Sequence, residues 1–183
     1  MSCIMKKFLL YSLLSIVILL IGGFLYITLT PPASPLDTSL FKEDGKEISI
    51  TYSKPYKKGR LIFGDKSEGA LVPFNQYWRT GANRHTIINT NSELIFNDNI
   101  LPSGEYSLYT IPGKDKWKVV INSENGYFGI VQPDESNDLF AFEAFPTNLN
   151  ESVEQLTIDF VSDSIGSSVR LRWDLTEVLM PFK

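Results

Sequence analysis

LPSGEYSLYTIPGKDKWKVVIN, residues 101–122, holds two strand-like segments on either side of a tight turn. In each segment the larger side chains recur at every second residue, as in a half-buried strand: Tyr106, Leu108 and Thr110, then Trp117, Val119 and Ile121. Between them, residues 112–115 (Pro-Gly-Lys-Asp) supply a turn. The stretch predicts an antiparallel hairpin with Tyr106 and Trp117 in the core. Tyr109 falls on the opposite face and is a candidate for ligand contact.

The same alternation recurs on both sides of this hairpin. It is found at 48–53, 156–160 and 169–175, where Leu175 continues the apolar face of the last segment. Turn-forming residues separate the segments, for example at 97–99 and 162–166. Residues 145–153 have the weak pattern of a single helical turn. Many short strands with frequent turns predict an all-β domain, an antiparallel β-sandwich with jelly-roll or immunoglobulin-like topology.

The N-terminal segment is strongly apolar, and no charged residue occurs between Phe8 and Leu36. About 22 residues of helix span about 33 Å, which matches the core of a bilayer. We therefore predict a transmembrane helix at 8–29 in the inner membrane, with residues 1–7 cytoplasmic because Lys6 and Lys7 precede it. A stiff spacer at 30–36 leads to the β-rich domain at 37–183, which then faces the periplasm or the cell exterior. The alternative is a cleaved signal peptide.

Composition excludes several kinds of function. The formal net charge is −4, and no basic residue occurs between Lys118 and Arg170. This acidic C-terminal half argues against a nucleic-acid partner, whose phosphates require a basic surface. A single cysteine permits no internal disulfide, and one histidine is too few for a zinc site. Only an oxygen-ligand calcium site stays open, and no EF-hand spacing supports it, so we expect neither a metal nor a cofactor.

Several longer stretches resemble one bacterial family. They are 50–64 (ITYSKPYKKGRLIFG), 71–88 (LVPFNQYWRTGANRHTII), 101–122, 153–160 (VEQLTIDF) and 171–181 (LRWDLTEVLMP). Together they resemble the domain of unknown function 2911 (DUF2911) family over about residues 34–182. The resemblance implies an exported β-rich domain and no established reaction. It also implies an acidic and a small residue after Asn83, where this chain has Arg84 and His85, so an activity that used that carboxylate would be changed here.

The most unusual polar stretch is 78–85, WRTGANRH. Arginine forks bind carboxylates, phosphates or sulfates, tryptophan stacks on sugars, and glycine lets a backbone approach a ligand. This pattern predicts an anion or glycan site on a loop of the domain. The predicted ligand-binding residues are Arg60, Trp78, Arg79, Gly81, Asn83, Arg84, His85 and Tyr109. The alternative is a structural corner, with Trp78 in the core, Arg79 paired with an acid and Asn83 capping a turn.

The absence of a catalytic motif favours a non-enzymatic ligand- or partner-binding module of the cell envelope. Its partner is expected to be a glycan, a small anion or an envelope protein. Two alternatives stay open. One is an envelope hydrolase that uses His85 with a carboxylate. The other is a structural subunit of an envelope complex, whose acidic half meets a basic partner.

Overall fold

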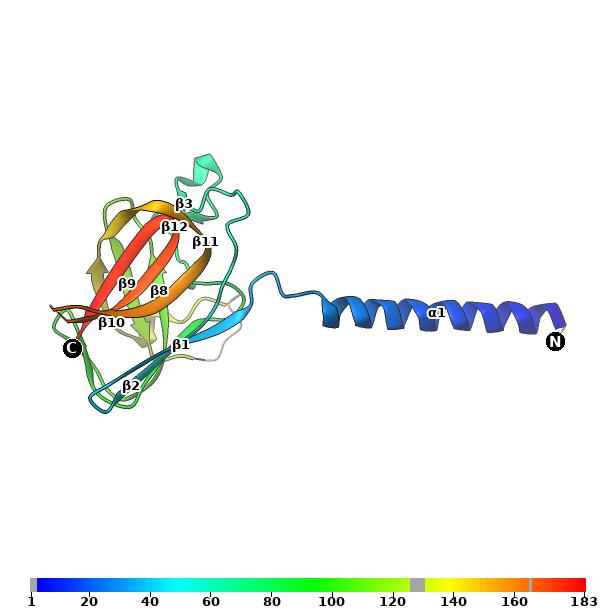
Figure 1. The fold of residues 1–183 in the computed structure, drawn as a ribbon, viewed down its shortest axis with the longest axis horizontal. Helices are drawn as coiled ribbons and strands as arrows, with labels where there is room; N and C mark the ends of the chain where they lie inside the picture. Colours follow the sequence, from blue (N-terminus) through cyan, green and yellow to red (C-terminus); the bar gives the residue numbers. More distant parts are fainter. Residues whose placement is uncertain (1–2, 126–130, 165) are drawn as a thin grey trace. The chain divides into compact units, whose positions relative to one another are not determined.

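The computed structural model describes residues 3–125, 131–164 and 166–183. It divides into two units, residues 1–33 and residues 34–183. The first unit contains α1, Cys3–Leu29, and the second contains all the strands (Figure 1). The predicted helix is therefore confirmed and begins before residue 8. Among the described residues, no helix meets the length and apolarity needed to cross a membrane, so the predicted transmembrane role gains no support.

The predicted all-β character of the second unit is confirmed, and its strands pair mostly antiparallel. The described strands are β1 (Leu36–Glu43), β2 (Lys46–Ser53), β3 (Phe63–Gly64), β4 (Val72–Pro73), β5 (Thr86–Thr90), β6 (Leu94–Phe96), β7 (Asn99–Leu101), β8 (Gly104–Ile111), β9 (Trp117–Asn122), β10 (Asp138–Ala144), β11 (Pro146–Ser162) and β12 (Ser167–Phe182). Two short 3-10 helices lie at Lys66–Glu68 and Glu135–Asn137. The helical turn predicted at 145–153 is wrong, because β11 runs through it.

Within the described residues, the largest sheet has six strands in the order β1-β2-β5-β8-β9-β10, all antiparallel to their neighbours. The predicted hairpin at 101–122 forms the fourth and fifth strands of this sheet: β8 pairs with β9, with Leu108 opposite Ile121 and Thr110 opposite Val119. These side chains face the core, and Trp117 is fully buried beside them. The alternation in the sequence therefore predicted the buried face correctly.

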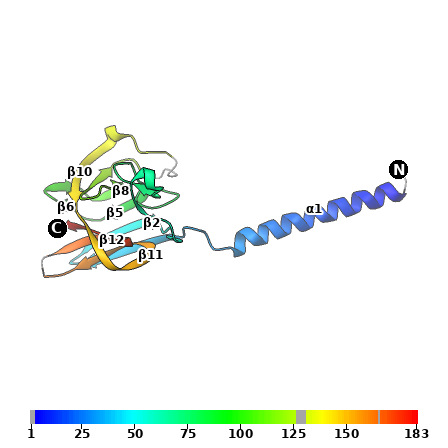
Figure 2. The same ribbon diagram turned by 90° about the horizontal axis from the view of Figure 1, so that it is seen from above.

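A second layer covers the apolar face of this sheet. The β11–β12 hairpin lies across it, below β8 and β10 in Figure 2. The end of β12 pairs with β6, where the backbones of Ile95 and Lys183 exchange hydrogen bonds of 3.0 and 3.1 Å. Between the layers, the hydroxyl of Tyr52 accepts a hydrogen bond from the main-chain N–H of Ile158 at 2.8 Å. One hydrophobic core therefore joins segments from both ends of the domain.

β12 changes its buried face in the middle. Val169, Leu171 and Trp173 are buried, and after them the buried set shifts by one position to Val178, Met180 and Phe182. The cause is Asp174, whose φ of 53° is left-handed and interrupts the alternation. Leu175, predicted to share the apolar face, is instead 47% exposed. That prediction is wrong because it assumed an unbroken strand.

Candidate functional site

The segment between β4 and β5 carries most of the predicted site, and Trp78 anchors it in the core. The indole is 8% exposed and stacks on Trp173, with ring centroids 5.9 Å apart. Its Nε1–H donates to the carbonyl oxygen of Gly81 at 3.1 Å, which closes a tight corner. Trp78 therefore occupies the position expected from the structural alternative, with its ring used in packing.

The corner after Trp78 is held by buried hydroxyl groups. Thr80 has a φ of 57°, and its hydroxyl reaches the hydroxyl of Thr110 at 3.1 Å, while Thr86 donates to the Thr80 carbonyl at 2.9 Å. A Cβ on Gly81 would lie 3.1 Å from the main-chain oxygen of Ser53. This close approach of two backbones favours glycine here without any ligand.

The face of the large sheet that points away from the core is polar, yet partly buried. Tyr109 lies on this face, as predicted, but it is only 3% exposed. Its hydroxyl donates to the Asp138 carboxylate, with oxygen distances of 2.8 and 3.0 Å, and the Asn122 amide donates to the same carboxylate at 2.8 Å. Burial, followed by the hydrogen bond to Asp138 and then the negative charge of that carboxylate, raises the pKa of Tyr109. The hydroxyl therefore stays protonated at neutral pH.

His85 lies just before β5 and is 3% exposed. Its Nε2 is 2.8 Å from the main-chain oxygen of Val131, a hydrogen bond that attaches the segment after β9 to the sheet. This contact gives the ring a structural use. The predictions that His85 contacts a ligand or acts as a base with a carboxylate stay untested.

At Arg79 and Tyr77, the polar ends of the side chains make no hydrogen bond among the described residues. Tyr77 packs on Tyr109, with ring centroids 5.2 Å apart, and its buried hydroxyl has no hydrogen-bond partner. Burial raises the pKa of Tyr77, and the positive charge of nearby Arg79 works in the opposite direction. Arg79 is half-buried, and no hydrogen bond or ion pair to its guanidinium is found within the described residues. The acidic partner expected in the structural alternative is therefore not seen among these residues.

Ser107 adds a second buried hydroxyl without a hydrogen-bond partner. It lies on β8, two residues before Tyr109 and therefore on the same face of the sheet. Sequence reasoning did not single out Tyr77 or Ser107 as site residues. Their positions in the sequence could have identified them. Ser107 alternates with the core-facing residues of β8, and Tyr77 immediately precedes the WRTGANRH stretch.

The other predicted residues are exposed and have different surroundings. Arg60 donates to two main-chain oxygens of its own loop, at Tyr56 and Lys57. Asn83 has a φ of 59°, and its amide reaches the carbonyl of Ser34 at 3.4 Å. Arg84 is exposed beside it. The structure thus brings Arg79 and Tyr109 together through Tyr77, while Arg60, Asn83 and Arg84 remain at the surface.

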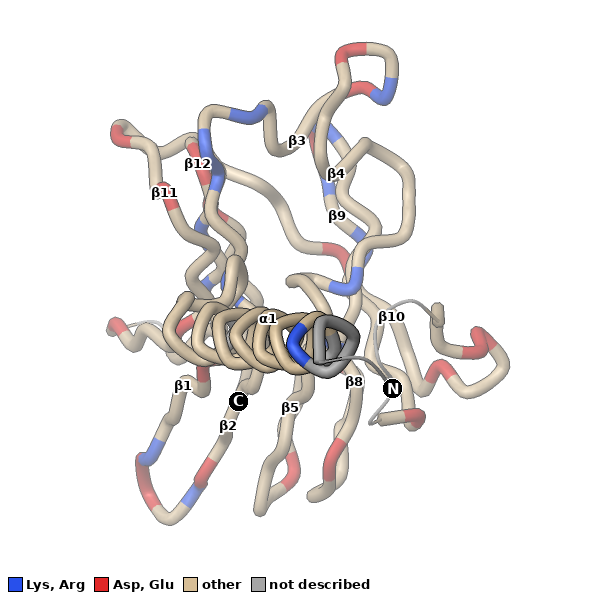
Figure 3. Tube along the Cα trace, turned by 90° about the vertical axis from the view of Figure 1, so that its right-hand side faces the viewer, with Lys and Arg blue, Asp and Glu red and all other residues tan. Residues whose placement is uncertain are grey.

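Charge around the site is uneven. Figure 3 shows acidic positions beside β10, and the chain between β9 and β10 contains Glu124 and Asp134. Glu124 is occupied by the loop itself, because it accepts hydrogen bonds from the Asp134 N–H and the Asn137 amide at 3.0 and 2.9 Å. In the part of the chain that is described, no three His, Cys, Asp or Glu side chains are grouped so that they could hold a metal ion.

A comparison with family models matches residues 34–182 to the family described as "Protein of unknown function (DUF2911)". No curated protein and no solved structure matches the chain.

Proposed function

We propose that this chain, which belongs to the DUF2911 family, is a binding module of the cell envelope that takes a small anionic ligand at Arg79 and Tyr77. The carboxylate, phosphate or sulfate group of the ligand would meet the Arg79 guanidinium. The observation that carries this proposal is a half-buried arginine with no counter-charge among the described residues, beside a buried tyrosine hydroxyl with no partner.

The physical argument rests on desolvation. A cation taken partly out of water loses hydration, and this loss is compensated when an anion meets it. The planar guanidinium offers paired donors that match two oxygens of such an anion. Tyr77 adds a neutral donor, because burial raises its pKa and keeps the hydroxyl protonated at neutral pH. An anionic sugar fits both predicted ligand classes, since its hydroxyl groups could also reach polar side chains on the same face.

Thermal unfolding with and without ligand tests this proposal. The three tryptophans are buried in the domain and report its unfolding by intrinsic fluorescence in the full chain, kept in detergent. We would add phosphate, sulfate, acetate or glucuronate, with glucose as the neutral control. A ligand at about 100 times its Kd stabilises the folded state by about 2.7 kcal/mol, and for a domain of this size that raises the unfolding temperature by about 5–10 °C.

Two variants locate the site. Arg79→Ala should abolish the anion-induced shift, and Tyr77→Phe should reduce it. Arg60→Ala is the matched control, because it removes the same side chain from a loop where its donors are already used. A shift that persists in Arg79→Ala, or one that Arg60→Ala removes equally, would overturn the assignment. So would the absence of a shift with every anion.

The envelope location is part of the proposal and rests on the apolar composition of α1, although no described helix qualifies as a membrane span. Its large side chains from Phe8 to Leu29, where described, are exposed, and they are apolar on all sides of the helix. A helix of this kind needs an apolar environment, which a lipid bilayer supplies. The layered packing of the second unit likewise supports a β-sandwich as its finer classification.

Membrane extraction tests the anchor. The full chain should stay in the membrane pellet after an alkaline carbonate wash, while a chain lacking residues 8–29 should be released. Intact mass of the pelleted protein distinguishes a retained helix from a cleaved signal peptide. Recovery of the full-length chain in the supernatant would refute the anchor.

A further inference from the structure

The site at Arg79 and Tyr77 lies on the outward face of the large sheet, and Trp78 fixes its register. The main chains of Trp78 and Thr110 exchange hydrogen bonds of 2.8 and 2.9 Å, so this segment runs antiparallel beside β8 at that point. Successive side chains point to opposite faces, and Trp78 points into the core. Tyr77 and Arg79 therefore point outward, and Tyr77 lies beside Ile111 of β8.

A second cation lies on the same face, one strand further along. Lys118 of β9 is opposite Ile111 in the β8–β9 register. Its neighbours Trp117 and Val119 are buried in the core, so its exposed side chain points outward. No hydrogen bond or ion pair to its ammonium group is found in the part of the chain that the structure describes. At about 4.8 Å per strand and about 3.3 Å per residue, the Cα atoms of Arg79 and Lys118 are about 12 Å apart.

This end of the sheet is positively charged, although the whole chain has a formal net charge of −4. Residues 114–118, together with Arg79 and Glu143, carry four positive and two negative charges. Glu143 is opposite Lys118 in the register of β9 and β10, but its carboxylate is bonded to Lys116 at 2.5 Å. The positive charge of Lys118 is therefore available to a ligand.

Other acidic groups on this face lie at its opposite end. Asp138 is opposite Asn122, which is four residues along β9 from Lys118, or about 13 Å. Glu135 is in the 3-10 helix that precedes Asp138 and so belongs to the same end. The face thus has an acidic end, where Tyr109 is bonded to Asp138, and a basic end at the β8–β9 turn.

Ile111 gives the surface between the two cations an apolar centre. It is half-buried and lies between Tyr77 and Lys118. We infer that the ligand of this site is a linear dianion with an apolar spacer, of the class of the dicarboxylates with terminal acid groups. One acid group meets Arg79, the spacer crosses Ile111, and the second acid group meets Lys118. This inference rests on the proposed function, because it takes Arg79 as the first anion site and narrows the ligand class from any small anion to a dianion.

Matched carboxylates test this inference on the full chain. Suberate has two terminal carboxylates, suberamate has the same length with one of them replaced by an amide, and succinate is a dianion with a shorter spacer. We expect suberate to bind about fivefold more tightly than suberamate, the gain that one exposed ion pair can supply, and succinate should lack this gain. Two-dimensional NMR titration measures each Kd and locates the perturbed residues. Equal Kd values for suberate and suberamate would overturn the second anion site.

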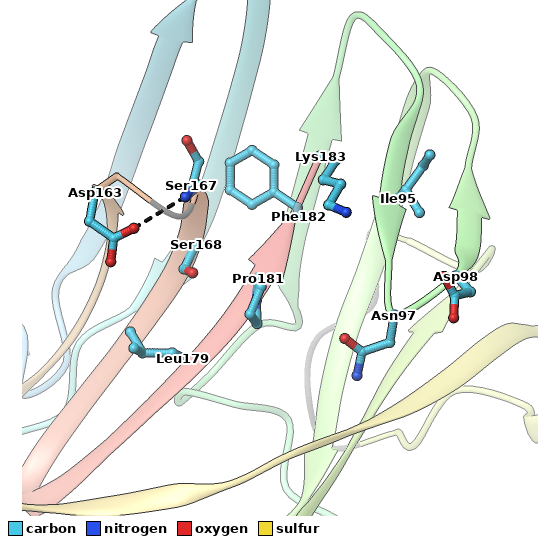
Figure 4. A pocket seen from close by; sticks show the side chains of 11 residues that line it. Ile95, Asn97, Asp98, Asp163, Ser167, Ser168, Leu179, Pro181, Phe182 and Lys183 are labelled. Carbon is cyan, nitrogen blue, oxygen red and sulfur yellow. Dashed lines mark hydrogen bonds between the residues drawn. The ribbon is translucent and has the colours of Figure 1, made fainter.

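Two lysine variants locate the second acid group. Lys118→Gln should remove the advantage of suberate and leave the Kd of suberamate unchanged. Lys183→Gln is the matched control and should change neither Kd. Lys183 is also an exposed lysine whose ammonium group has no partner among the described residues, and it lines a separate cavity of about 580 Å³ where β12 meets β6 (Figure 4). If Lys183→Gln removed the advantage instead, the dianion would be bound in that cavity, and the inference would be overturned.

Arg79→Ala distinguishes failure of this inference from failure of the proposed function. If suberate and suberamate bind equally to the parent chain and both are lost in Arg79→Ala, the proposed function stands and only the dianion is refuted. If both bind Arg79→Ala as tightly as the parent chain, the anion site itself is refuted, and the inference fails with it.

Discussion

Replacing Asp174 should separate the backbone and side-chain requirements of the break in β12. Asp174 combines a left-handed backbone, with φ at 53°, and a carboxylate that accepts hydrogen bonds from Lys57 at 2.5 Å and Ser152 at 2.8 Å. We expect the free energy of unfolding to fall in the order Asp, Asn, Gly, Ala at this position. Asparagine keeps an acceptor and tolerates positive φ, glycine keeps only the backbone freedom, and alanine keeps neither.

The magnitudes follow from these contacts. The Lys57 and Asp174 side chains are 24% and 17% exposed, so their charge-assisted hydrogen bond is partly screened, and its loss with that of the Ser152 bond costs about 2 kcal/mol. Holding alanine at positive φ costs about 1 kcal/mol more. We therefore expect losses of about 1 kcal/mol for Asp174→Asn, 2 for Asp174→Gly and 3 for Asp174→Ala.

Urea unfolding followed by tryptophan fluorescence measures these differences. With a slope of about 2 kcal/mol per molar urea, the glycine variant should unfold at about 1 M less urea than the parent chain. Asp44→Ala is the backbone control, because Asp44 has a φ of 49° in an exposed turn, and it should lose only about 1 kcal/mol. The reasoning is refuted if the alanine and glycine variants at 174 are equally stable, or if asparagine is no better than glycine.

The pKa of Asp159 is lowered because its ion pairs with Arg170 and Arg172 outweigh the effect of burial. The free energy of unfolding should therefore be constant above pH about 4 and fall below it. Asp159→Asn should cost about 1–2 kcal/mol at pH 7 and should reduce this loss of stability in acid, as measured by unfolding curves at several pH values. Because the pKa of Tyr109 is raised in the folded state, its contribution to stability is complete below pH about 10 and is lost above it. Tyr109→Phe should therefore reduce the fall in melting temperature between pH 8 and pH 11. An unchanged fall would contradict this. Gly81→Ala should lower the free energy of unfolding in urea by about 1–3 kcal/mol, since its Cβ would lie too close to the Ser53 carbonyl oxygen. A variant as stable as the parent chain would show that the backbone at this corner can move to accommodate the Cβ.

Local patterns were sufficient to predict several strands, including both strands of the β8–β9 hairpin, but neither the start of β11 nor the point where β12 changes face. The β8–β9 hairpin depends on alternation and a turn within 22 residues, so its buried face was readable from residues 101–122. The reversal at Asp174 depends on Lys57, which is distant in the chain and reaches Asp174 only in the folded state. A tertiary bond that fixes the backbone of one residue leaves no periodic signal in the sequence.

The candidate site was partly predictable for the same reason. The WRTGANRH stretch was identified by its composition, and it does contain the open guanidinium of Arg79. Its neighbours could not be identified, because the position of Tyr77 over Tyr109 depends on a loop folding back onto a sheet. Trp78 and Arg79 are adjacent in sequence, yet one is packed in the core and the other is half-buried at the surface. Composition alone does not distinguish those two environments.

The order of the two layers along the chain has a consequence for biogenesis. All strands of the six-stranded sheet precede β11 and β12, which cover it. A chain that is synthesised from its N-terminus therefore presents the uncovered apolar face of that sheet until the hairpin at 146–182 has been made. During this interval the half-built domain is exposed to misassociation, and a chaperone that shields apolar strands would act then. Nascent chains stalled before residue 146 should accordingly be the ones that such a chaperone retains.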